Sequence, residues 1–174
     1  VLAGLAGTAL AANQTDDAQL RAAIAGSHRS PANVARDTWR HPYETLTFFG
    51  IKPNMTVVEL LPEGGWYTEI LAPYLRQDGK LIGAGPISKT LLESNPAVYD
   101  KVVRAPFNPP KGIYNFAPPN SVDMVLTFRN VHNFVDLGDD KVKEMFKGLY
   151  ASLKPGGVLG VTDHRLRSEE HTSE

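Results

Sequence analysis

The sequence predicts an α/β fold built on a parallel sheet, and two observations support this prediction. Helical segments separate short apolar runs that are typical of buried strands. Strands that alternate with helices form right-handed crossovers, which place helices on both faces of one parallel sheet. The strand-like runs are residues 55–61, 80–85, 101–105, 122–128 and 158–163.

The helical segments carry their own boundary signals. Ser30 and Pro31 combine an N-cap with a proline at the first helical position, which predicts a helix through Arg36. Gly50 is suited to end the helix that follows Pro42. Helical spacing also marks residues 16–26, 66–75, 89–102 with a break at Pro96, and 139–153, where one stripe holds Val142, Met145, Phe146, Leu149 and Leu153.

Composition limits the classes of protein to consider. The chain has 174 residues, of which 42% are hydrophobic and 21% charged, as in an ordinary globular domain. A net charge of −1 without a long basic run argues against a nucleic-acid partner. The absence of cysteine excludes disulfides, thiolate metal sites and a cysteine nucleophile.

The first residues resemble the end of an export signal. VLAGLAGTALAANQ is small and apolar, turns polar at Asn13, and contains Ala9-Leu10-Ala11, a small-x-small cleavage pattern. We interpret residues 1–12 as the tail of a signal peptide, which predicts a periplasmic or secreted protein; the alternative is a short helix. The run is too short to span a membrane, so we expect no stable span in the mature chain.

The last eight residues, RSEEHTSE, have no apolar periodicity and resemble the translation of a common sequencing-adapter read. We therefore exclude residues 167–174 from fold reasoning as an expected artefact; the alternative is a native polar tail. Residues 13–42 are assigned to a helical lead-in and residues 43–166 to the sheet domain.

Ligands of open parallel sheets bind at the carboxyl ends of the strands, near the switch point of the strand order. After the first strand, Glu59 offers a carboxylate, Gly64 and Gly65 let a ligand approach the backbone, and the next helix begins with free N–H groups. This loop is suited to a nucleotide-like ligand. The alternative is a tight turn that binds nothing.

Three stretches, VVELLPEGGWYTEI, NSVDMVLTFRNVHNF and SLKPGGVLGVTDH, resemble class I S-adenosylmethionine-dependent methyltransferases over about residues 36–166. RHPYETLTFFG, GGWYTEILAPYL and RNVHN are closest to a group of exported bacterial methyltransferase-like proteins. The resemblance implies a Rossmann-like sandwich, S-adenosylmethionine as cofactor, and methyl transfer to a small acceptor. It also implies two further strands after the fifth, so we expect the C-terminal strands to be missing from this chain.

The family pattern for the first loop is acid-x-Gly-x-Gly-x-Gly. Glu59 matches the acid and Gly65 the third glycine, whereas Leu61 and Glu63 replace the first two. Glu63 would either crowd the methionine part of the cofactor or form a salt bridge with its ammonium. We assign to the cofactor-binding set Glu59, Leu61, Glu63, Gly64 and Gly65 of this loop, Trp66 at the start of the next helix, and Asn108 after the third strand. The alternative for Trp66 is that it packs on a neighbouring helix.

The second strand ends without the acidic residue that usually binds ribose hydroxyls, which leaves Ser88 as a substitute or no ribose site. The missing acid also argues against a nicotinamide-dependent reductase.

The catalytic candidates follow the fourth strand. Arg129 and Asn130 are suited to orient a polar or anionic acceptor, and His132 to act as general base. The alternative is that Asn130 and Asn133 cap a turn while His132 packs beneath the helix.

Asp163 and His164 follow the fifth strand, beside the fourth, and with His132 would form an acid–base cluster or a metal site. We assign no metal, because no helical H-x-x-x-H pair is present. Arg40-His41-Pro42 either folds over the pocket mouth or marks a helix boundary fixed by Pro42.

The sequence supports two functions. The first is a methyltransferase that uses S-adenosylmethionine and acts on an unknown small acceptor. The second is an exported binding protein that keeps the fold without methylating, because the cofactor is made in the cytoplasm and two motif glycines are replaced.

Overall fold

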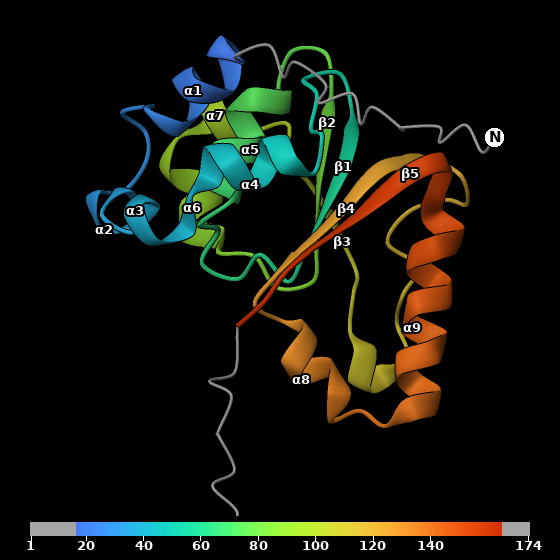
Figure 1. Ribbon diagram of the computed structural model, residues 1–174. Coiled ribbons are helices and arrows are strands. Elements are labelled where there is room, and N and C mark those ends of the chain that lie inside the picture. Colours follow the sequence, from blue (N-terminus) through green and yellow to red (C-terminus); the bar gives the residue numbers. More distant parts are fainter. Residues whose placement is uncertain (1–16, 165–174) are drawn as a thin grey trace, which may run out of the picture.

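The computed structural model describes residues 17–164 and contains a five-stranded parallel sheet in the order β3-β2-β1-β4-β5 (Figure 1). All five predicted strands are present, and the α/β prediction is confirmed. Their bounds are β1 Thr56–Leu60, β2 Lys80–Ala84, β3 Val103–Ala105, β4 Val122–Phe128 and β5 Leu153–Thr162.

Helices cover both faces of this sheet, as predicted (Figure 1). One side carries α1 Ala18–Ile24, α2 Pro31–Val34, α3 Asp37–Arg40, α4 Pro42–Phe48, α5 Thr68–Leu75, α6 Lys89–Ser94 and α7 Pro96–Tyr99. The other side carries α8 Val131–Val135, α9 Asp139–Ser152 and the 3-10 turn η1 Pro109–Lys111.

The alternation of β1 explains the two cores. Val57 packs with α1, α4 and α5, whereas the next residue, Val58, packs with α8 and α9. Because successive side chains point to opposite faces, a strand buried on both sides must be apolar throughout. Glu59 is the exception among the four buried residues of this strand.

Several predicted helix boundaries differ from the structure by two or three residues, and the local contacts explain two of them. The helix at Pro31 ends at Val34 instead of Arg36, because the chain starts a new turn, α3, at Asp37, whose carboxylate pairs with buried Arg29. The helix expected from Trp66 begins at Thr68, since Trp66 and Tyr67 still belong to the turn that leaves β1.

The turn expected at residues 154–157 lies inside β5 as a bulge. Val122 pairs with Leu153 and Met124 with Val158, so only Asp123 lies opposite four residues of β5. The Lys154 ammonium lies 2.8 Å from the Asp123 carboxylate and holds the bulge against β4.

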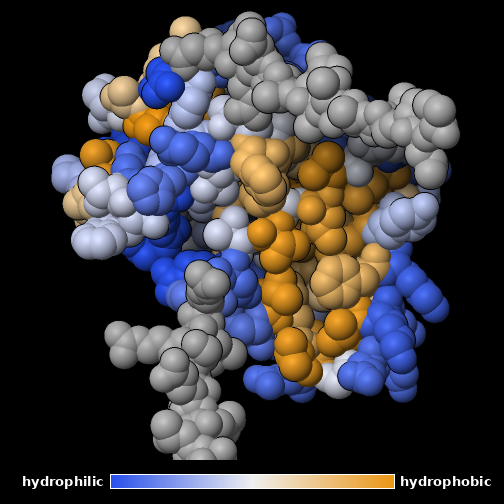
Figure 2. Space-filling model, in the orientation of Figure 1, coloured by the Kyte–Doolittle hydropathy of each residue, from blue (hydrophilic) through white to orange (hydrophobic). Residues whose placement is uncertain are grey.

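β5 forms one edge of the described sheet and exposes Val158 and Val161. Figure 2 shows apolar residues gathered on this face, over β5 and toward α9, while hydrophilic residues dominate the side of α1–α6.

The predicted signal-peptide tail (1–12) and adapter segment (167–174) lie outside the described residues. Within residues 17–164, no helix is long and apolar enough to cross a membrane.

Candidate functional site

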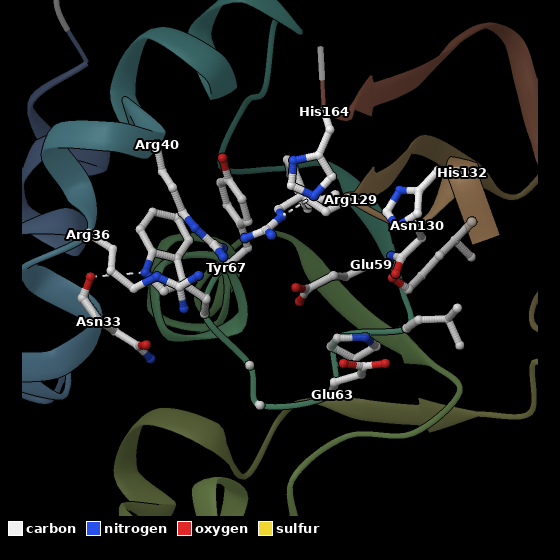
Figure 3. Close-up of a pocket in the computed structure, with 17 residues that line it drawn as sticks. Asn33, Arg36, Arg40, Glu59, Glu63, Tyr67, Arg129, Asn130, His132 and His164 are labelled. Atoms are coloured by element: carbon white, nitrogen blue, oxygen red, sulfur yellow. Dashed lines mark hydrogen bonds between the residues drawn. The ribbon is translucent and has the colours of Figure 1, made fainter. Parts of the chain in front are cut away.

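The strand order reverses between β1 and β4, and a pocket of about 380 Å³ opens at their carboxyl ends (Figure 3). This volume lies in the range of roughly 300–1,000 Å³ typical of small-molecule sites. The pocket is lined by Asn33, Arg36, Arg40, Glu59, Leu60, Leu61, Pro62, Glu63, Gly64, Gly65, Trp66, Tyr67, Phe128, Arg129, Asn130, His132 and His164. The pocket brings together all the predicted cofactor-binding and catalytic residues except Asn108.

The loop after β1 keeps the backbone of a glycine-rich turn although two glycines are absent. Leu61, Glu63 and Gly65 occupy the three glycine positions of the motif. Their φ angles are 49°, 48° and 78°, so all three lie in the left-handed region. Glycine adopts this region freely, whereas another residue there costs about 1–2 kcal/mol. The alignment of this loop with acid-x-Gly-x-Gly-x-Gly therefore has a conformational basis.

Backbone hydrogen bonds to the segment after β2 hold this conformation. The N–H of Leu61 donates to Ala84 O and that of Glu63 to Pro86 O, both at 2.8 Å. The N–H of Ser88 donates in turn to Glu63 O at 2.7 Å. These bonds compensate the unfavourable φ angles, so the loop is held open toward the pocket.

The two glycines of the loop have different roles. A Cβ on Gly65 would lie 2.1 Å from the Leu91 side chain, so this glycine lets α6 pack against the loop. A Cβ on Gly64 would meet nothing within 4 Å, and Gly64 lines the pocket. A ligand can therefore approach the backbone at Gly64.

Glu59 lies at the floor of the site, 3% exposed, and accepts a hydrogen bond from Thr68 Oγ1 at 2.7 Å. Burial raises the pKa of Glu59 to about 7, and the Thr68 hydrogen bond opposes that shift only in part. The carboxyl group can thus exist in either protonation state near neutral pH.

Asn130 occupies the N-cap position of α8, but its side chain does not cap the helix. Its Nδ2 donates to Leu60 O at 3.3 Å and to Thr127 Oγ1 at 3.2 Å, which ties the ends of β1 and β4 together. The capping alternative for Asn130 is therefore wrong.

His132 lies at the pocket rim and is paired with Asp163, so the alternative of a histidine packed under the helix is also wrong. Its side chain is 48% exposed, and Nδ1 lies 2.8 Å from Asp163 Oδ1. Because a carboxylate can only accept, Nδ1 carries a proton, and in the neutral ring Nε2 then has the free lone pair.

Several hydrogen bonds keep Asp163 ionised. Its oxygens accept from the backbone N–H groups of His132 and His164 as well as from the His132 ring. Burial alone would raise the pKa of Asp163, but these bonds together lower it to about 2.

His164 completes the cluster that the sequence predicted. His132, Asp163 and His164 offer ligand atoms within 4.8 Å of one another. However, Arg129 Nε lies 3.0 Å from His164 Nε2, and both Asp163 oxygens already accept hydrogen bonds. A guanidinium against the cluster disfavours a second cation, so this arrangement favours proton exchange over metal binding.

The lead-in contributes more to the pocket than the sequence indicated. His41 and Pro42 form a helix boundary, with Pro42 at the first position of α4, but Arg40 lines the pocket. Its guanidinium lies 4.6 Å from the centre of the Trp66 ring, and Trp66 Nε1 donates to Asn33 O at 2.9 Å. Sequence reasoning missed Asn33 and Arg36; the only signal was the RHP motif nearby.

Two candidates do not reach the pocket. Asn108 caps η1 through Lys111 N and lines separate hollows beside Pro109. Ser88, the suggested ribose ligand, caps α6 by accepting from Leu91 N at 3.1 Å. Both follow strands on the β2–β3 side, where the polar side chains are used in local turns.

No protein-family model and no curated protein matches the sequence. The structure is similar to a crystal structure of a SAM-dependent methyltransferase from Aquifex aeolicus, with a TM-score of 0.61 and 20% identity over 80% of this chain and 72% of that one.

Two further crystal structures are similar over less than two thirds of their own length. The carbon methyltransferase CurJ has a TM-score of 0.55 and 14% identity, over 81% of this chain and 38% of that one. The cyclase SpnF has a TM-score of 0.52 and 14% identity, over 83% and 55%. The chain therefore has the Rossmann-like fold of S-adenosylmethionine-dependent methyltransferases.

Proposed function

We propose that this protein is a methyltransferase that binds S-adenosylmethionine in the β1–β4 pocket and acts on a small acceptor. The observation that carries the proposal is the loop after β1, which has positive φ at Leu61, Glu63 and Gly65 and begins at buried Glu59. Strained backbone of this kind persists where the surrounding structure and the function require it.

The residues present fit this cofactor. The pocket is open above Gly64, and the Glu59 carboxyl group lies at the strand end, where it can accept hydrogen bonds from a ligand. Glu63 is exposed on the loop and would pair with the ammonium group of the cofactor. Arg40 would pair with the carboxylate of the cofactor. Leu61, Gly64, Gly65 and Trp66 would form the wall around it.

The bound cofactor would supply an electrophilic methyl group on a sulfonium, which is released as the neutral thioether. His132 would accept the proton of the attacking oxygen or nitrogen at Nε2, with Asp163 holding the ring in that tautomer. Proton removal by a positioned base contributes about 10²- to 10⁴-fold. Positioning of the acceptor by the pocket walls would supply the larger part.

A second candidate is a binding protein that keeps the fold without transferring methyl groups. Glu63 in place of a motif glycine favours it, because Glu63 lines the pocket and adds a side chain where the motif has none. The similarity to the cyclase SpnF also illustrates that one fold serves different chemistries. For either function we propose the export predicted from residues 1–12.

Calorimetric titration with S-adenosylhomocysteine tests the proposal directly. We expect binding in the micromolar range for the wild type, and its loss in Gly64→Leu, because Gly64 lines the pocket and a Cβ there would meet nothing within 4 Å. The Gly64→Leu variant should keep the melting temperature of the wild type, which separates a blocked site from misfolding.

Glu63→Gly distinguishes the two candidates. Weaker binding in this variant would show that Glu63 holds the ammonium group of the cofactor, as the methyltransferase proposal requires. No binding by the folded wild type, with binding gained in Glu63→Gly, would favour the binding protein with a lost cofactor site.

A further inference from the structure

Three arginines converge on one side of the pocket. Arg36 and Arg40 come from the segment around α3, and Arg129 from the end of β4. In Figure 3 they lie on the side away from Glu63. Burial and the charges of Arg36 and Arg129 lower the pKa of Arg40, which shows that the three cations act on one another.

Within the part of the chain that the structure describes, none of these arginines has an acidic partner. Among residues 17–164, the ion pairs use Arg29, Arg76, Lys89, His132 and Lys154, but none of the three. Like charges held together without a counter-ion destabilise a folded protein. The convergence of the three arginines therefore does not stabilise the fold, and we look for its explanation in ligand binding.

The fold holds the three arginines in place. Buried Arg29 forms a bidentate pair with Asp37 at 2.7 and 2.8 Å, which fixes α3 between Arg36 and Arg40. Arg129 has a φ of 63°, an uncommon angle for arginine, and its Nε donates to His164. The buried Arg29–Asp37 pair and the positive φ of Arg129 thus direct guanidinium groups toward the same space. The first requires a buried ion pair and the second a strained backbone.

That space is a second hollow of about 410 Å³ that adjoins the cofactor pocket. The three arginines line both hollows, together with Tyr67, Phe128 and His164. Trp39, Thr162 and Asp163 line only the second one, and Trp39 is 83% exposed. The hollow thus combines aromatic walls with three guanidinium groups and one carboxylate, that of Asp163, whose oxygens already accept hydrogen bonds from His132 and His164.

We propose that the second hollow binds the acceptor, and that the acceptor is a small molecule with an anionic oxygen group, a carboxylate or a phosphate. Guanidinium groups bind such oxyanions through paired, charge-assisted hydrogen bonds. The exposed ring of Trp39 and the stacked pair of Tyr67 and Phe128 would pack against its apolar part. This inference rests on the proposed function, since it names the acceptor class of the same site.

Benzoate and benzamide are matched probes, alike in shape and different in charge. We would titrate each into the full chain saturated with S-adenosylhomocysteine. The carboxylate of that ligand would then already be paired with Arg40, its proposed partner. We expect benzoate to bind at least about tenfold more tightly than benzamide, and added salt to reduce the difference.

The variant Arg36→Gln/Arg129→Gln should lose that preference. The control Lys143→Gln/Lys147→Gln removes the same charge from the exposed face of α9 and should keep it. Equal binding of the two probes, or an equal loss in the control, would overturn the inference.

The outcomes for the two proposals are separable. Binding of S-adenosylhomocysteine without a preference for benzoate would leave the cofactor proposal intact and refute the anionic acceptor. If S-adenosylhomocysteine does not bind, the cofactor proposal fails, and the same probe pair applied to the ligand-free chain tests the anion site alone.

Discussion

At the scale of single residues, Glu59 shows how the site uses a position that the fold reserves for apolar side chains. Its neighbours in β1 are buried valines and leucine, yet its only described side-chain partner is the hydroxyl of Thr68. A buried carboxyl group with a single neutral donor resists ionisation. The site is therefore expected to make the protein's stability depend on pH.

The sign of this dependence follows from the raised pKa. Between the ordinary value of 4.5 and the folded value of about 7, the unfolded chain ionises Glu59 while the folded chain keeps it protonated. The stability that Glu59 contributes is complete below pH 4.5 and is lost as the pH rises through 7. We expect the free energy of unfolding to fall by about 2 to 3 kcal/mol from pH 5 to 8 through this residue.

Urea denaturation of the wild type and Glu59→Gln at both pH values measures this contribution. Glutamine has the same shape and does not ionise. The free energy of unfolding of the variant should therefore fall by about 2 to 3 kcal/mol less than that of the wild type between pH 5 and 8. If the two proteins lose stability in parallel, Glu59 is already ionised in the fold and the assignment of its pKa is wrong.

At the scale of secondary structure, α5 contains a proline that a neighbouring histidine compensates. Pro73 has no N–H to donate to the carbonyl of Glu69, four residues earlier. His28 lies 2.7 Å from that carbonyl oxygen through Nε2 and donates in its place. The lead-in is thus attached to the helix that begins at the cofactor loop.

Removing this donor should destabilise the protein. We expect His28→Ala to lower the free energy of unfolding by about 1–2 kcal/mol, because the Glu69 carbonyl is left unpaired. In a Pro73→Ala background the helix supplies its own N–H, so the same substitution should cost clearly less. Equal costs in both backgrounds, measured as a double-mutant cycle, would show that the contact contributes nothing.

At the scale of the whole molecule, the two edges of the described sheet differ. β3 is short, with three residues, whereas β5 is long and exposes Val158 and Val161 beside an apolar face (Figure 2). Long apolar edge strands pair with other chains. We therefore expect this chain to self-associate through β5.

Sedimentation velocity at several protein concentrations tests this expectation. Val161→Lys should shift the wild type toward monomer, since a charged edge opposes strand pairing. Val103→Lys places the same charge on the opposite edge, at a similarly exposed valine, and should change little. A wild type that stays monomeric at all concentrations would refute the prediction.

The sequence by itself determined the order of strands and helices, because buried strands and amphipathic helices have local periodicities. It also located Glu59, the loop to Gly65, and the stretch from Arg129 to His132 at the strand ends, since a parallel sheet brings those ends to one edge. The register of the loop was predicted even though Leu61 and Glu63 replace glycines.

Only the tertiary structure decided what these residues contact. The positive φ of Leu61 and Glu63 depends on hydrogen bonds to the segment after β2, and the tautomer of His132 on Asp163, 31 residues away. Arg36 reaches the pocket because the lead-in packs on α5 and turns at Asp37. Such contacts join residues far apart in the chain, so no local pattern of the sequence encodes them.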